Sequence, residues 1–300
     1  MRVIVTGASG QLGRLVTEAL LERLSPADLI LVTRGRRALD DLAERGVEVR
    51  HGDFDEPASL SEAFAGGERM LLISTPTIGR RIEQHRAALS AAAAAGVRHV
   101  VYTSVTNPVK GHPTGVLADE NRGTEEMLQG GDFTWTTLRN APYAELQLPL
   151  GAMAVTYGKL VTNAGDGRIA PISRADCAAA AAAVLTTDGH EGQTYEITGP
   201  QALSQADIAS LVSKVSGRPV QVVQTSDRRL MWGLLRLGMP RPVARSVVQL
   251  GQATREGYFD LVDPAFKAIV GRSPRPLRDV LIEHRGQLVA DAQPGSVAYG

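Results

Sequence analysis

Short runs of apolar residues alternate with longer amphipathic stretches through the first half of the chain. The apolar runs predict buried strands at residues 3–6, 29–33, 47–50, 70–74, 99–103 and 135–138. The stretches between them have apolar residues at helical spacing and predict helices at residues 11–23, 36–45, 57–64, 80–95 and 120–128. Strands and helices that alternate with short connections favour a doubly wound α/β fold, with a parallel sheet between two layers of helices.

The alternation becomes less regular after about residue 145. Proline and glycine accumulate between residues 149 and 171, and an alanine-rich helix is predicted at residues 174–185. Strands are then predicted at 194–198 and 220–223, with helices at 204–215, 228–237 and 243–253. We expect a first domain at residues 1–145 and a smaller α/β lobe at residues 146–300 that is partly interleaved with the first sheet. The last residues, 294–300, are expected to fray.

The balance of charges narrows the classes of partner. The chain has 32 basic and 32 acidic side chains, which gives no reason to expect a nucleic acid or an anionic membrane as partner. Its single cysteine, Cys177, allows no intrachain disulfide, and the six histidines lack metal-ligand spacing, so no metal site is predicted. His85 and His112 lie in polar stretches and are expected to be exposed. Because a strand starts directly after Met1 and no long apolar stretch follows, a cytoplasmic protein is expected.

A glycine-rich turn follows the first predicted strand. Gly7, Gly10 and Gly13 stand three residues apart between this strand and the first helix. Glycine permits a tight turn and close backbone approach, and the free N–H groups at the start of a helix favour a pyrophosphate. This place in a strand–turn–helix unit predicts a Rossmann-type domain that binds a dinucleotide. The alternative is a glycine turn kept for packing alone.

The residues after the second strand bear on the choice between NAD and NADP. NAD-preferring sites usually place a carboxylate there for the ribose 2′-hydroxyl, whereas this chain has Arg34-Gly35-Arg36-Arg37. A guanidinium suits the 2′-phosphate, so NADP(H) is predicted, with Arg34 as its ligand. Arg36 and Arg37 are left out of the site because they could simply form the solvated start of a helix.

Two further strand ends supply candidates for the cofactor site. After the third strand, Asp53 could accept a hydrogen bond from the adenine amine and Phe54 could stack on the ring. The alternative there is an Asx-turn beside a core phenylalanine. Ser74 and Thr75 end the fourth strand, and we expect them to line the nicotinamide-ribose side.

Several motifs in a fixed order resemble those of a known family. They are TGASGQLG, VEVRHGDFDEP, LLIST, AGVRHVVYTS, LADENRGTEEML, TLRNAPY and AGDGRIA followed by SRAD. Together they are similar to the NmrA-like atypical short-chain dehydrogenases, and within them to the bacterial NADPH:quinone oxidoreductase and triphenylmethane reductase group. The match runs from residue 1 to about residue 220.

The resemblance implies where NADPH and an acceptor lie. It implies cofactor contacts at Gly7, Ser9, Gly10, Gln11, Leu12, Arg34, Asp53, Phe54, Ser74 and Thr75. It also implies that the nicotinamide and the substrate are faced by Tyr102, Thr103, Ser104, Asn140 and Tyr143. The family string LADEH has a histidine where this chain has Asn121. If that histidine positions or protonates the substrate, Asn121 cannot titrate in its place.

The tyrosine–lysine pair of ordinary short-chain dehydrogenases is missing, because no tyrosine here has a lysine four residues later. Without a matched acid, reduction of an isolated carbonyl to an alkoxide is disfavoured. A quinone, an enone or a carbocation accepts hydride more easily, because the reduced product is a weaker base or is uncharged. The candidate catalytic residues are Asn140, Tyr143 and Ser104. Strand-end capping and core packing are the alternative roles for these side chains.

These features predict an NADPH-dependent reductase of a quinone-like or conjugated aromatic acceptor. Two alternatives stay open: a regulator that binds NADP(H) without turnover, and a tailoring enzyme that acts on a polycyclic aromatic intermediate. The expected partner is a small aromatic or quinone molecule, with no nucleic acid and no membrane. A homodimer is a further option, because the alanine-rich helix at residues 87–95 could pack against a twin or lie on its own sheet.

Overall fold

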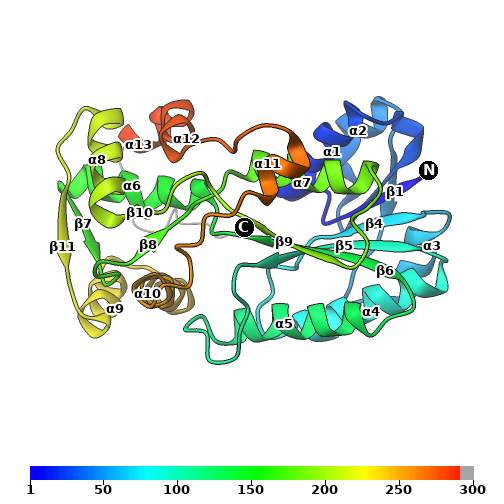
Figure 1. Cartoon of the computed structure of the whole chain (residues 1–300), viewed down its shortest axis with the longest axis horizontal. Helices are drawn as coiled ribbons and strands as arrows, with labels where there is room; N and C mark the ends of the chain where they lie inside the picture. Colours follow the sequence, from blue (N-terminus) through cyan, green and yellow to red (C-terminus); the bar gives the residue numbers. More distant parts are fainter. Residues whose placement is uncertain (291–300) are drawn as a thin grey trace.

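A seven-stranded parallel sheet forms the centre of the computed structural model, which describes residues 1–290 (Figure 1). Its strands are β1 (Val3–Thr6), β2 (Leu29–Thr33), β3 (Glu48–His51), β4 (Arg69–Leu72), β5 (His99–Val105), β6 (Thr134–Asn140) and β9 (Gln193–Ile197). Their order is β3-β2-β1-β4-β5-β6-β9, and every neighbouring pair is parallel. The order reverses between β1 and β4, which is where sheets of this kind bind ligands. The predicted doubly wound α/β fold is confirmed.

Helices cover both faces of this sheet. On one face a first core is buried beneath α1 (Gln11–Leu21), α2 (Asp40–Glu44), α7 (Arg174–Thr186) and α11 (Ala265–Val270). On the other face a second core is buried beneath α3 (Leu60–Phe64), α4 (Arg81–Ala94) and α5 (Val116–Gln129). Because both faces are covered, the inner strands are apolar runs, and every residue of β1 and β2 is buried. Short 3-10 turns lie at Pro26–Asp28, Arg36–Leu39, Pro57–Ser59 and Ala144–Leu146.

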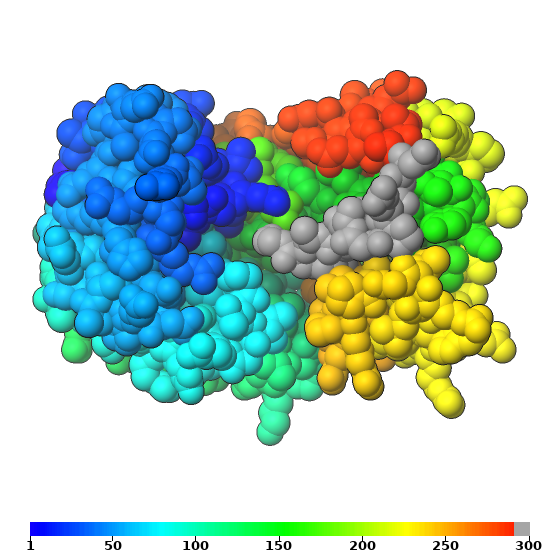
Figure 2. Space-filling view, turned by 180° about the vertical axis from the view of Figure 1, so that it is seen from behind, coloured from blue at the N-terminus to red at the C-terminus, as the bar shows by residue number. Residues whose placement is uncertain are grey.

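A second group of elements lies beyond the carboxyl ends of the strands. It consists of α6 (Gln147–Tyr157), β7 (Lys159–Thr162), β8 (Arg168–Ile169), β10 (Leu203–Ser204), α8 (Gln205–Ser216), β11 (Gln221–Gln224), α9 (Asp227–Arg236), α10 (Arg241–Arg255), α12 (Leu277–Glu283) and α13 (Arg285–Val289). β8 pairs with β10 in antiparallel fashion and β7 with β11 in parallel. The group has two apolar cores of its own, one around α6, α8 and α12 and one between α9 and α10. Figure 2 shows the two groups at opposite ends of the molecule.

The chain passes between the two groups several times. After α6, β7 and β8 it returns to the sheet to form α7 and β9, and after α10 it returns again as α11 (Figure 1). A first domain that ends at residue 145 therefore contains only part of the sheet and its helices. The division into two domains stays a prediction, and the predicted fraying of residues 294–300 lies outside the described residues.

Most of the predicted strands and helices agree with the structure to within a few residues, but α6 is absent from the prediction. Pro149 is the third residue of this helix. Proline is tolerated in the first turn because the N–H that it lacks would have no acceptor within the helix. The helices α11 to α13 are also absent from the prediction. No helix among residues 1–290 combines the length and apolar character needed to cross a bilayer.

Candidate functional site

The glycine turn joins β1 to α1 at the point where the strand order reverses. Gly7 has a φ of +61°, a left-handed conformation that favours glycine, and its carbonyl accepts a hydrogen bond from the Gly10 N–H at 3.0 Å. Gly10 is the N-cap of α1, and neither a side-chain cap nor an acidic residue occupies the first turn. The first N–H groups of the helix therefore stay available to an anion. Leu12 is buried, so only its backbone can reach such a ligand.

Gly13 permits the close contact between α1 and this turn. A Cβ at this position would lie 2.3 Å from the Gly7 carbonyl oxygen and 2.7 Å from the Ala8 Cα. Both distances are far below van der Waals contact, so only glycine fits without movement of the backbone. The turn is thus both packed against the helix and open to a phosphate, as the spacing of its glycines predicts.

Three exposed arginines follow the end of β2 beside the turn: Arg34, Arg36 and Arg37. The Thr33 hydroxyl donates to the Ser9 Oγ at 2.9 Å, which ties the end of β2 to the glycine turn. Arg34 follows, is exposed, and forms no ion pair with any residue between 1 and 290. Its carbonyl oxygen lies 3.2 Å from the His51 Nδ1, which fixes the backbone at the start of the loop. The side chain is free to bind the 2′-phosphate, as expected for NADP(H).

In the loop after β3, Asp53 forms an Asx-turn and Phe54 packs in the core, which is the alternative to adenine binding given above. The Asp53 Oδ1 accepts a hydrogen bond from the Asp55 N–H at 3.0 Å, which is an Asx-turn. Phe54 is partly buried and packs against the second core. Contacts of these two residues with the adenine stay a prediction, because each side chain already has a structural role.

The loop after β4 is held by hydrogen bonds to its backbone and side chains. The Ser74 N–H donates to the Thr103 Oγ1 at 3.0 Å, and the Thr75 hydroxyl donates to the Gln84 Oε1 at 2.6 Å. The Thr75 N–H donates to the His85 Nε2 at 3.2 Å. Ser74 and Thr75 are partly buried beside the reversal of strand order, where the sequence places them. Their positions are therefore set before any ligand arrives.

The prediction that His85 and His112 are exposed is wrong. His85 has no exposed surface and His112 is 4% exposed. His85 can be buried although its sequence neighbours are polar, because both of its ring nitrogens have hydrogen-bond partners inside the protein. These partners are Thr75 and Thr124. Burial, with a smaller effect of Arg81, lowers the pKa of His85 to about 3, so its ring stays neutral near pH 7.

The side chains of Tyr102 and Ser104 bind to residues of α5, so their contacts with the nicotinamide and the substrate stay a prediction. The Tyr102 hydroxyl donates to the Asn121 Oδ1 at 2.7 Å inside the second core, and the Ser104 hydroxyl donates to the Glu125 Oε1 at 2.6 Å. Side chains alternate between the faces of a strand, so residues two apart share one face. That face of β5 is covered by α5. Thr103 lies on the opposite face, where its Oγ1 supports the loop after β4.

Asn121 is a structural residue in this protein. It is fully buried, and besides accepting from Tyr102 it donates from Nδ2 to the Leu117 carbonyl at 2.7 Å. A side chain at this position points between α5 and β5. In this chain Asn121 therefore joins α5 to β5.

Asn140 and Tyr143 come together at the end of β6. The Asn140 side chain is 5% exposed, and neither its Oδ1 nor its Nδ2 has a hydrogen-bond partner within the described chain. Tyr143 is partly buried against the first core, with the Arg174 guanidinium 4.6 Å from the centre of its ring. Burial raises the pKa of Tyr143, whereas the Asn140 amide, which is near the hydroxyl but outside hydrogen-bond geometry, lowers it. The hydroxyl stays protonated near neutral pH and can donate one hydrogen bond.

Arg81 is a residue of this region that the sequence interpretation omits. It is the first residue of α4 and only 7% exposed. Its backbone N–H donates to the Glu120 Oε1 at 2.9 Å, which holds the start of the helix. The sequence shows two adjacent arginines, Arg80 and Arg81, and nothing in the pattern tells which one turns inward.

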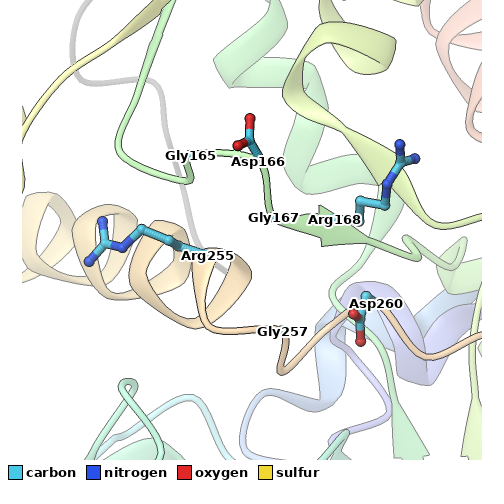
Figure 3. A pocket seen from close by; sticks show the side chains of 7 residues that line it. All are labelled: Gly165, Asp166, Gly167, Arg168, Arg255, Gly257 and Asp260. Atoms are coloured by element: carbon cyan, nitrogen blue, oxygen red, sulfur yellow. The ribbon is translucent and has the colours of Figure 1, made fainter.

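A depression of about 500 Å³ lies elsewhere, in the second group of elements. It is lined by Gly165, Asp166, Gly167, Arg168, Arg255, Gly257 and Asp260. Figure 3 shows the charged side chains pointing apart from one another, so they do not converge on one ligand. Arg255 is already paired with Asp227 at 3.1 Å. None of the predicted site residues lines this depression, and we therefore place the candidate site at the strand ends.

Comparisons with known proteins agree with this placement. A family model described as NAD(P)H-binding matches residues 7–188, from the glycine turn to α7. The chain is 37% identical over 259 residues to quinone oxidoreductase 2 of Escherichia coli strain K12, covering 86% of this chain and 90% of that protein.

Solved structures extend the likeness to the whole fold. The NADPH complex of the NADPH-dependent quinone oxidoreductase QOR2 from Escherichia coli has a TM-score of 0.90 at 33% identity, covering 95% of this chain and 99% of that one. The NADP(H) complex of Citrobacter sp. triphenylmethane reductase has a TM-score of 0.87 at 33% identity, with the same coverage. The glycine turn, the sheet order and these matches lead to one conclusion: the chain belongs to the NAD(P)H-binding family.

Proposed function

We propose that this protein is an NADPH-dependent reductase that transfers hydride to a quinone-like or conjugated aromatic acceptor. The observation that carries the proposal is the buried amide of Asn140, whose two polar atoms have no partner in the described chain. A buried polar group without partners costs free energy that a ligand can recover. The nicotinamide carboxamide offers both the donor and the acceptor that this amide needs, and an acceptor oxygen offers one of them.

The other end of the site suits the phosphates of NADPH. The uncapped first turn of α1 presents N–H groups to the bridging phosphates, and no acidic residue in that turn repels them. The free Arg34 side chain beside Thr33 is suited to the 2′-phosphate. NADPH, when bound, supplies the hydride, and these residues bind and orient it.

The class of acceptor follows from the proton donors that are available in the site. Tyr143 has a raised pKa and no lysine to lower it, so it is a poor proton donor to an isolated alkoxide. A hydroquinone anion is a much weaker base and a reduced cationic dye needs no proton. The names of two relatives, a quinone oxidoreductase and a triphenylmethane reductase, support the same classes of acceptor.

Steady-state oxidation of NADPH tests the proposal. The panel contains a benzoquinone, menadione, a cationic triphenylmethane dye and an isolated ketone as the negative control. We expect quinones to accelerate NADPH oxidation well above the rate without protein, and the ketone to have no effect. Tight NADPH binding by calorimetry without acceleration by any acceptor would contradict a reductase and favour the regulator that only binds NADP(H).

A further inference from the structure

The side chain of Arg81, at the start of α4, is almost fully buried. Its Nε has no hydrogen-bond acceptor, and the group forms no ion pair with any residue of the described part of the chain. Arginine stays charged at any pH that a protein tolerates. A buried charge that is neither paired nor fully hydrogen-bonded is costly, which points to an acceptor from outside the protein.

The carboxylate of Glu120, which interacts electrostatically with this cation, is used elsewhere. Both Glu120 oxygens accept from the Gly79 N–H at 3.0 Å, and one also accepts from the Arg81 N–H at 2.9 Å. Glu120 therefore fixes the backbone at the start of α4 and makes no bond with the guanidinium. Arg174, which is equally buried, has Glu145 at 3.6 Å. The contrast indicates that Arg81 is kept free for a ligand.

Arg81 is close enough to Tyr143 to interact with it electrostatically. Burial lowers the pKa of Arg81, and Tyr102, Glu120 and Tyr143 are close enough to oppose this effect. Tyr143 in turn lies next to the orphaned Asn140 amide at the end of β6. Tyr143 therefore links the cation at the start of α4 to the amide at the end of β6.

We propose that Arg81 is a catalytic residue that binds the carbonyl oxygen of a quinone-like acceptor and stabilises the negative charge that develops on it. This inference rests on the proposed function. In the reaction the C4–H bond of NADPH breaks with both electrons, and a new bond forms to the acceptor. NADP⁺ results, and the hydroquinone monoanion takes its proton from water. Arg81 supplies no proton, and its contribution is electrostatic stabilisation of the oxyanion.

The same charge sets a preference between classes of acceptor. A quinone gains negative charge as hydride arrives, which a fixed cation favours. A cationic triphenylmethane dye starts positive and becomes neutral, so a neighbouring guanidinium opposes its binding. Arg81 therefore raises the activity towards quinones relative to cationic dyes.

The test compares Arg81→Gln and Arg81→Lys with wild type, with Arg86→Gln as the matched control. Arg86 is an exposed arginine on the same helix. For Arg81→Gln we expect kcat/KM with menadione to fall about 100-fold, the effect of losing one oxyanion donor. Arg81→Lys keeps part of the activity because it keeps the charge. With the cationic dye, kcat/KM for Arg81→Gln stays unchanged or rises, and Arg86→Gln matches wild type with both acceptors.

Fluorescence titration with NADPH and thermal unfolding complete the comparison. NADPH affinity of Arg81→Gln stays at the wild-type value, and Arg81→Met replaces this variant if it does not fold. Unchanged activity with menadione, or an equal loss with menadione and dye, overturns the inference. So does a loss of NADPH affinity that accounts for the lost activity, because Arg81 would then bind the cofactor. A wild-type protein that reduces neither acceptor contradicts the proposed function itself.

Discussion

The side chains at the strand ends fall into two kinds. Thr75, Thr103 and His85 have their hydrogen bonds satisfied by the protein, and they hold the loop after β4 in place. Asn140 and Arg81 are equally buried but have unpartnered polar atoms. A satisfied group gains little from a ligand, whereas an orphaned one recovers its desolvation cost. We therefore expect Asn140 and Arg81, rather than the satisfied side chains, to recognise the reacting groups.

We predict that Arg34 sets a preference for NADPH over NADH. Arg34→Ala removes a charge-assisted contact with the 2′-phosphate, and we expect NADPH affinity to fall about 10- to 100-fold. NADH affinity changes little because NADH lacks that phosphate. Calorimetry with both nucleotides measures the change, and Arg37→Ala is the control because Arg37 is an exposed arginine of the same loop region. Equal losses for NADH and NADPH would show that Arg34 acts on something other than the phosphate.

At the scale of elements, the pattern of apolar and polar residues alone predicts most strands of the sheet. Strands buried on both faces are continuous apolar runs, and α1 presents a clear apolar face, so both are visible in the sequence. The direction of a side chain at a strand end is not visible. Tyr102 and Ser104 lie near the carboxyl end of β5, but their side chains are on the face of the strand that α5 covers. The sequence therefore predicts the strands and the glycine turn, but not which face of a strand each side chain at its end occupies.

The contact between α1 and the glycine turn can be tested by adding one methyl group. In Gly13→Ala the new Cβ meets the Gly7 carbonyl at 2.3 Å, so the helix must move away from the turn. We expect the free energy of unfolding to fall by about 1–3 kcal/mol and NADPH affinity to fall with it. Urea unfolding and calorimetry measure the two effects.

Gly233→Ala is the control for that variant. Gly233 lies within α9 and an added Cβ meets nothing within 4 Å. Alanine is a better helix former, so this change is expected to stabilise the protein by about 0.5–1 kcal/mol and to leave NADPH binding unchanged. If Gly13→Ala instead behaves like Gly233→Ala, the close approach is not what shapes the turn.

For the molecule as a whole, buried histidines make stability depend on pH. Burial lowers the pKa of His85 to about 3 and that of His112 to about 4. Unfolded histidine titrates near pH ~6.5, so below that pH the unfolded state binds more protons than the folded state. The stability that these neutral rings contribute is fully present above pH ~6.5 and is lost as the pH falls to about 4 for His112 and about 3 for His85.

Replacing His85 by glutamine should weaken this dependence. Glutamine can accept from the Thr75 N–H and donate to the Thr124 hydroxyl, but it does not titrate. Between pH 6 and 4 we expect the slope of unfolding free energy against pH to decrease by up to about 1.4 kcal/mol per pH unit. Urea unfolding at several pH values measures the slope. His51→Gln, at an exposed position, controls for the loss of an imidazole, and an unchanged slope in His85→Gln would refute the expectation.

The repeated return of the backbone to the sheet has a mechanical consequence. Two domains joined by a single linker can open by a hinge motion at that linker. Here the chain leaves the sheet to form α6, β7 and β8, returns to form α7 and β9, and leaves again to form β10 to α10. It then returns a second time as α11, which packs against the sheet. Any widening of the space above the strand ends must bend several connections at once. For the same reason the protein cannot be cut after β6 into independent fragments, since the first would lose its edge strand and part of one helical layer.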